Sequence, residues 1–136
     1  MADLVLMAPA IRPIQIFSGD QVEWRWELLE RWEYLVRRVS GSSVDLVRRV
    51  IEPGFRWDGS TKPLHNKAIF VTASSHWSMV VPSMEHDELC NNRVEVKAMG
   101  ITSADAAWHF YQQCLAYKTG YAWAQWKAVL WGGPQW

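Results

Sequence analysis

The fold that we expect for this chain is inferred first from residues 20–39, DQVEWRWELLERWEYLVRRV. Apolar side chains recur through the stretch at helical spacing. Glutamates precede arginines by four residues, a spacing that stabilises the exposed face of a helix. The stretch therefore predicts an amphipathic helix that ends at Gly41. Its apolar positions are Val22, Trp26, Leu29, Val36 and Val39, and its charge pairs are Glu27–Arg31 and Glu33–Arg37.

The segments around this helix extend the prediction. Residues 12–17 (RPIQIF) alternate between apolar and polar side chains, which predicts a short strand, and Pro13 places it at a sheet edge. A second helix is expected from Ser42 or Ser43 to Ile51, joined to the first by a helical corner. Residues 52–66 contain Pro, Gly, Asp and Asn and predict a long loop.

The second half predicts three strands and then two helices. Strands are expected at 67–73, 76–82 and 93–100, with an acidic connection at 82–92. A helix capped by Thr102 or Ser103 should extend to about Thr119. Residues 121–131 fit a helix by the spacing of 123, 126 and 130, although Tyr121 and Trp123 alone would suit a strand.

Together these segments predict an α+β fold in a single domain, residues 1–136. We expect a small antiparallel sheet of three to four strands with about four helices packed on it. The expected order is strand, helix, helix, strand, strand, strand, helix, helix.

The composition narrows the classes of function. The chain has 14 Lys and Arg, 14 Asp and Glu, and a formal net charge of zero. A balanced charge disfavours a general nucleic-acid binder and makes self-association easier. There is no candidate signal peptide or apolar span, and the two cysteines suggest no disulfide framework. We expect a cytoplasmic protein that has no membrane contact (the host cytoplasm, if the protein is viral).

Catalytic and metal-binding patterns are weak. His86 and Cys90 are four residues apart, but no second pair of ligands completes a zinc site. Ser75 and His76 would point to opposite faces of a strand, so His76 is a poor base for Ser75. We therefore predict no catalytic residue, no cofactor and no metal, and keep a small hydrolase as a third interpretation.

The strongest signal is tryptophan, which accounts for ten residues, five of them in the last 29 positions. A small domain does not easily cover so many indoles, and Trp and Tyr dominate interface hot spots. We therefore predict that the C-terminal segment, residues 120–136, docks at a protein interface. The expected interface residues are Tyr117, Tyr121, Trp123, Trp126, Trp131 and Trp136.

A nucleic-acid site is the alternative. Arginine pairs end both early helices, where they could contact phosphates, and nearby indoles could stack on bases. The run VEWRWELL, residues 22–29, resembles the tryptophan-bearing helix of plant-virus silencing suppressors, a resemblance that implies binding to short RNA duplexes. The residues of this site would be Trp24, Arg37, Arg38, Arg48, Arg49, Arg56 and Trp57.

The leading prediction is a non-enzymatic protein that acts through protein–protein contact. Its partner would be another copy of itself, most simply in a dimer, or a different protein. The small size, the tryptophan content and the weak catalytic patterns are typical of a viral or phage accessory or structural protein.

Overall fold

Strands occupy the first part of the described chain and helices the last. The structure, a computed structural model, describes residues 7–57, 77–118 and 122–136. The strands are β1 (Ile11–Ser18), β2 (Gln21–Leu28), β3 (Trp32–Ser40), β4 (Ser43–Ile51) and β5 (Arg56–Trp57). A short 3-10 helix, η1 (Trp77–Met79), then leads into α2 (Val80–Asn91), α3 (Arg93–Ala98), α4 (Ser103–Ala116) and α5 (Ala122–Gly132).

Two β-hairpins are built in the same way. The strands β1 and β2 pair in antiparallel register up to Ser18 and Gln21, and β3 and β4 pair up to Ser40 and Ser43. Each hairpin therefore turns on two residues. The first of them is Gly19 in one hairpin and Gly41 in the other, each with a φ of 60°. Glycine adopts this left-handed conformation at little cost, and turns of this kind match the twist of paired strands.

The hairpins belong to two small sheets, one ordered β1-β2-β5 and the other β3-β4. Backbone hydrogen bonds fix the end of β2 to the segment before β5. The Leu28 amide donates to the Phe55 carbonyl and the Gly54 amide donates to the Leu28 carbonyl, each at 2.8 Å. These bonds hold the bases of both hairpins close to one another.

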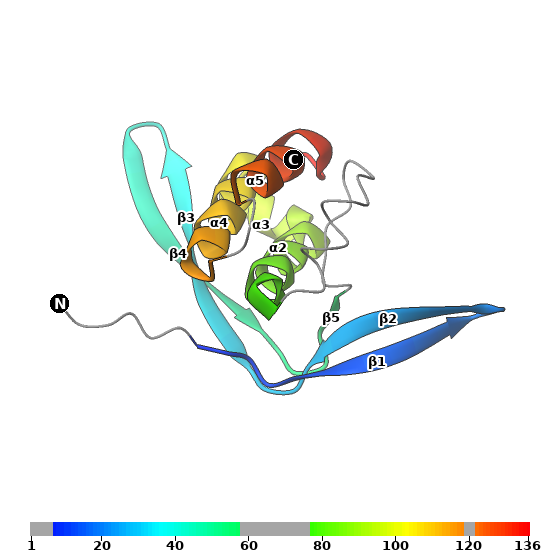
Figure 1. Ribbon diagram of the computed structural model, residues 1–136. Helices are drawn as coiled ribbons and strands as arrows, with labels where there is room; N and C mark the ends of the chain where they lie inside the picture. Colours follow the sequence, from blue (N-terminus) through cyan, green and yellow to red (C-terminus); the bar gives the residue numbers. More distant parts are fainter. Residues whose placement is uncertain (1–6, 58–76, 119–121) are drawn as a thin grey trace.

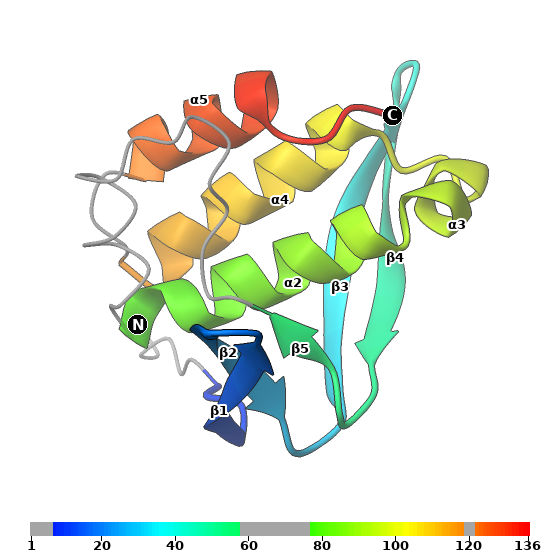
Figure 2. The same cartoon turned by 90° about the vertical axis from the view of Figure 1, so that its right-hand side faces the viewer.

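The helices form one layer, and the two hairpins extend from it on opposite sides (Figure 1). The helices α2, α4 and α5 lie side by side, with α4 in the middle (Figure 2). The strand β3 lies against α4, whereas the β1–β2 hairpin extends away from the helices past β5 (Figures 1 and 2). Much of each hairpin is therefore in solvent.

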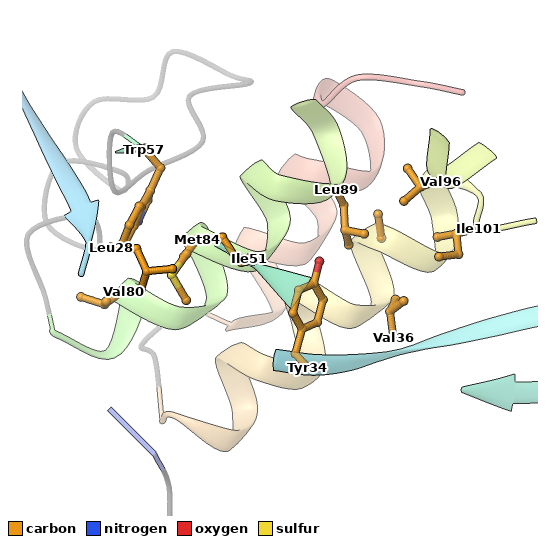
Figure 3. Close-up of a cluster of buried hydrophobic side chains, with 11 residues drawn as sticks. Leu28, Tyr34, Val36, Ile51, Trp57, Val80, Met84, Leu89, Val96 and Ile101 are labelled. Carbon is orange, nitrogen blue, oxygen red and sulfur yellow. The ribbon is translucent and has the colours of Figure 1, made fainter. Parts of the chain in front are cut away.

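The main core lies between the hairpin bases and α2 (Figure 3). Trp57 is buried there, and its Nε1 donates to Ser83 Oγ at 3.1 Å. Burial of a side chain of this size contributes on the order of 2–3 kcal/mol. The other members of the core are Leu28, Tyr34, Val36, Ile51, Val80, Met84, Leu89, Val96, Ile101 and Ala106. A smaller cluster, Met79, Ala107, Phe110, Cys114 and Val129, joins α4 to α5.

The α+β class is confirmed, but the predicted order of elements is wrong in the first half. The strand expected at 12–17 is confirmed by β1. The helices expected at 20–39 and at 42–51 are wrong, because these residues form β2, β3 and β4. The supposed helical corner at Gly41 is a hairpin turn.

In the second half the outcome is mixed. The helix expected after Thr102 is confirmed by α4, which a capping box begins: Thr102 Oγ1 accepts from the Asp105 amide, and Asp105 Oδ2 accepts from the Thr102 amide. The helical alternative for 121–131 is confirmed by α5. The strands expected at 76–82 and 93–100 are wrong, because η1, α2 and α3 occupy their described residues. The strand expected at 67–73 lies outside the described residues.

Candidate functional site

An exposed aromatic face on α5 is the first candidate site. Trp123 and Trp131 are 61% and 72% exposed. They are eight residues apart, two turns of helix, and Lys127 lies midway between them on the same face. The Lys127 Nζ is 5.7 Å from the Trp123 ring centre and 5.1 Å from that of Trp131. We call these three residues the α5 face.

The other described residues of the predicted interface are half-buried and contact other parts of the chain. Trp126 is half-buried against Tyr111, at 4.8 Å between ring centres, and against Trp108, at 5.6 Å. The Trp136 Nε1 donates to the Ile101 carbonyl at 2.9 Å. The Tyr117 hydroxyl donates to the Met7 carbonyl at 2.7 Å. Tyr121 lies outside the described residues.

The arginines of the alternative site are largely neutralised by neighbouring carboxylates. Arg38 pairs with Asp45, Arg48 with Glu33, and Arg56 with Glu27. The pKa of each of these carboxyl groups lies below its usual range, mainly because the arginine donates a hydrogen bond to it. Such exposed pairs leave little net positive charge for a phosphate backbone.

Two further residues of that site are buried. Arg49 is inside the molecule, and Trp57 is only 2% exposed and has no face available for a base. Trp24 is 60% exposed near the end of the β1–β2 hairpin, beside the Arg25–Glu23 pair. The VEWRWELL segment that resembles a suppressor helix is a strand over residues 22–28.

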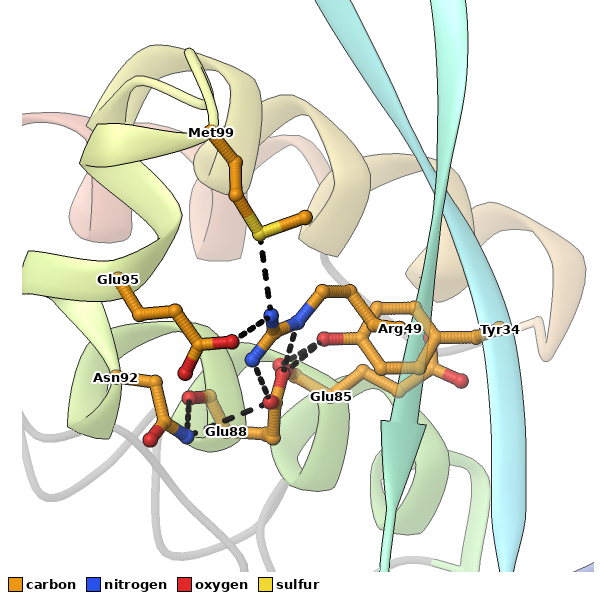
Figure 4. A network of polar contacts seen from close by, with 7 residues as sticks. All are labelled: Tyr34, Arg49, Glu85, Glu88, Asn92, Glu95 and Met99. Carbon is orange, nitrogen blue, oxygen red and sulfur yellow. Dashed lines mark hydrogen bonds and ion pairs between the residues drawn. The ribbon is translucent and has the colours of Figure 1, made fainter.

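A buried polar network connects β3 and β4 with α2 (Figure 4). Arg49 forms ion pairs with Glu88 and with Glu95, the latter at 2.9 Å. The Tyr34 hydroxyl donates to Glu88 Oε2 at 2.5 Å. Burial opposes the charge on Arg49, but hydrogen bonds to Glu88 and Glu95 outweigh that cost and raise its pKa. Burial, followed by the negative charge of Glu88, raises the pKa of Tyr34 above its usual range.

The Glu85 carboxylate is a second centre of this network. It accepts hydrogen bonds from Trp32 Nε1 at 2.7 Å, and its other oxygen accepts from Gln113 Nε2 at 2.6 Å. His109 Nε2 lies 2.6 Å from that second oxygen. Glu85 is thus a buried carboxylate whose partners come from β3 and α4, and it fixes the strand to the helix layer.

His86 and Cys90 lie together but have the character of a core pair. The Cys90 Sγ is 3.6 Å from His86 Nδ1, and both side chains are buried. Burial lowers the pKa of His86 to about 4, with a smaller contribution from His109, and raises the pKa of Cys90 to about 12. No group of three or more metal-ligating side chains occurs in residues 7–57, 77–118 and 122–136. Ser75 and His76 lie outside those ranges.

A groove between the β3–β4 hairpin and α4 is a site that the sequence did not suggest. Its volume is about 410 Å³, and its apolar walls are Leu35, Leu46 and Trp108. The Arg37 guanidinium lies over the Trp108 ring, 4.7 Å from its centre. The Arg37 Nε is buried and has no hydrogen-bond partner among the described residues. His109, Gln112 and Gln113 complete the lining.

Comparisons with known proteins give no relative. No protein-family model matches the chain, and no curated protein or solved structure is significantly similar to it. Within the ranges that the structure describes, no helix has the length and apolar character needed to cross a bilayer. The candidate function therefore depends on the surfaces described above.

Proposed function

We propose that this chain is a non-enzymatic assembly protein that associates with another copy of itself through the α5 face. The observation that carries the proposal is the exposure of Trp123 and Trp131 on one side of α5, with Lys127 between them. Exposed tryptophans that lie together on a rigid helix are typical of interface hot spots. Lys127 contacts both rings, and a cation over an indole also keeps an aromatic surface compatible with water.

A two-fold dimer would bring together four of these indoles, two from each copy. Covering their exposed parts contributes about 1.5 kcal/mol each, or about 6 kcal/mol in all. Association costs about 4–15 kcal/mol in lost freedom of motion. The α5 face alone therefore supports a weak, concentration-dependent dimer, and a stable assembly needs a second contact.

Light scattering over a concentration series tests this proposal. We expect the average mass to rise with concentration from 15.8 kDa to at least twice that value. The double variant Trp123→Ser/Trp131→Ser should shift the midpoint of this rise to at least tenfold higher concentration. Val94→Ser is the matched control, because Val94 is an exposed apolar residue on α3 and should leave the midpoint unchanged. A double variant that associates like the wild type would refute the proposal.

Nucleic-acid binding is the less supported alternative, since carboxylates neutralise most of the arginines that suggested it. Titration with a short RNA duplex at low and high salt tests it directly. Binding that falls steeply with salt, and is lost in Arg37→Ala/Arg48→Ala, would favour this alternative over assembly.

A further inference from the structure

The groove beside β3 contains an arginine, Arg37, for which the described part of the chain supplies no acidic partner. Each of the other seven arginines in residues 7–57 forms an ion pair with a carboxylate. The Arg37 guanidinium lies over the Trp108 ring, and its buried Nε has no hydrogen-bond acceptor among the described residues. A cation at an apolar groove without a counter-charge is suited to an anionic group that arrives with an apolar neighbour.

The apolar wall of the groove continues along exposed side chains of the β3–β4 hairpin. Leu46 is 62% exposed, and Leu35, Val39 and Val44 are exposed along the same hairpin. Leu46 pairs with Arg37 across the strands, and Val44 pairs with Val39. An apolar strip therefore leads from the end of the β3–β4 hairpin to the guanidinium of Arg37.

The end of the β1–β2 hairpin complements the groove in charge and in apolar surface. Asp20 occupies its two-residue turn and has no ion-pair partner in the described part of the chain. Phe17 and Val22 face each other across the strands next to that turn, and both are exposed. Trp24 follows two residues along the same strand face and is also exposed. This end presents one carboxylate that has no ion-pair partner among the described residues, together with three large apolar side chains.

We propose that the end of the β1–β2 hairpin of one copy docks in the Arg37 groove of a second copy. The Asp20 carboxylate would accept hydrogen bonds from the Arg37 guanidinium, while Phe17, Val22 and Trp24 cover the strip that includes Leu46. The contact pairs an arginine and an aspartate that form no ion pair with the residues that the structure describes. It also covers two apolar surfaces that a single copy leaves in water.

The β1–β2 hairpin and the β3–β4 hairpin, which lines the groove, extend on opposite sides of the helix layer (Figure 1). The hairpin end of one copy therefore cannot reach the groove of the same copy. Two copies joined by one such contact still have one free hairpin end and one free groove. When each copy places its hairpin on one neighbour and receives the hairpin of another, the contact is head-to-tail and produces a ring or an open chain. The inference goes beyond the proposed dimer, since it uses neither Trp123 nor Trp131.

The test begins from the Trp123→Ser/Trp131→Ser chain, in which the α5 face is removed. The hairpin variant adds Asp20→Arg/Trp24→Ser and keeps the groove. The groove variant adds Leu46→Asp and keeps the hairpin. Asp20, Trp24 and Leu46 are exposed, so their substitution should leave thermal unfolding unchanged. Arg37→Gln serves as a second groove variant if Leu46→Asp unfolds at a lower temperature.

We expect the parent chain to grow beyond a dimer with concentration in analytical ultracentrifugation. The hairpin variant alone and the groove variant alone should remain near the monomer mass of 15.8 kDa at concentrations up to at least tenfold above those at which the parent associates. A 1:1 mixture of the two should give a complex of twice that mass that grows no further, because only one intact hairpin meets one intact groove.

A parent chain that is monomeric at every concentration would overturn the inference. Single variants that associate like the parent would also overturn it, and so would a mixture that stays monomeric. The outcomes also separate the two proposals. If the parent associates as strongly as the wild type, the α5 face fails while the hairpin contact stands. If the wild type alone associates, the α5 face stands and the hairpin contact fails.

Discussion

Arg49 and Glu88 form an ion pair in which both partners are buried, with side-chain exposures of 8% and 4%. One residue lies on β4 and the other on α2, so the pair joins the hairpin to the helix layer. Tyr34 and Asn92 also donate to the Glu88 carboxylate, and Glu95 supplies a second acceptor for Arg49. The polar atoms that burial removes from water are thereby given partners inside the protein.

Removing one partner of this pair should destabilise the protein strongly. Glu88→Gln leaves the Arg49 charge buried with only Glu95 to balance it, and we expect a loss of about 3–5 kcal/mol in the free energy of unfolding. Urea unfolding at pH 7 measures the loss. The control is Glu33→Gln, because Glu33 also accepts two hydrogen bonds from one arginine, Arg48, but on the exposed surface. The control should lose less than about 1 kcal/mol, and equal losses would contradict this account.

Acid should weaken the fold through His86. Burial holds the pKa of His86 at about 4 in the folded chain, below the ordinary value of 6.5. Its contribution to stability is therefore complete above pH 6.5 and is lost as the pH falls towards 4, because the unfolded chain takes up the proton first. Between pH 7 and pH 5 this group alone should cost about 2 kcal/mol.

The variant His86→Phe isolates this contribution, since an aromatic ring can keep the contact with Phe110. Unfolding by urea at pH 7 and at pH 5 should show a smaller difference in stability for the variant than for the wild type. An unchanged difference would show that His86 does not titrate in this way.

Cys90 should be unreactive in the folded protein. Burial raises the pKa of its thiol to about 12, so the thiolate fraction at pH 8 is about a thousandfold below that of an ordinary cysteine. In a Cys114→Ala chain, which leaves one thiol, a disulfide reagent should react with Cys90 at least a hundredfold more slowly than in urea. Rapid reaction under native conditions would place Cys90 at the surface instead.

The turn of the β3–β4 hairpin should require glycine. Gly41 has a φ of 60°, and no atom lies within 4 Å of the position that a Cβ would occupy there, so the cost of a side chain is conformational alone. Gly41→Ala should lower the free energy of unfolding by about 1–2 kcal/mol. Ser42→Ala, at the next position of the turn, should be nearly neutral. The inference about strain at Gly41 would fail if both variants melted at the wild-type temperature.

The sequence contains the signals of both hairpins. We expected helices in these segments because one spacing of apolar residues fits a helix and a strand alike. Val22 and Trp26 are four residues apart, a spacing that fits one helical turn and also two repeats of a strand. The deciding signals were the alternation from Val22 to Leu28 and the dipeptides Gly19-Asp20 and Gly41-Ser42, which are typical of two-residue hairpin turns. In the α3 segment a strand was expected and a helix is found. Val94 and Val96 alternate with charged residues as in a strand, but the segment is a short helix in which only Val96 is buried.

The candidate sites could be predicted only in part. The tryptophan-rich C-terminal segment indicated an aromatic surface, but residue type could not tell the exposed Trp123 and Trp131 from the docked Trp136. The arginines show the same limit. Arg37 and Arg49 look alike in sequence, but the strand register places Arg37 opposite Leu46 and Arg49 opposite Tyr34. One therefore lies beside a groove and the other in the core.

The order of the elements has a consequence during synthesis. The buried side chains Leu28, Val36 and Trp57 emerge from the ribosome before Met84 and Leu89, the α2 residues that share their core. Two-stranded hairpins are at best marginally stable in water by themselves. A peptide that stops after residue 57 should therefore show no cooperative melting, and the nascent chain should gain its native resistance to protease only after α2 has cleared the exit tunnel.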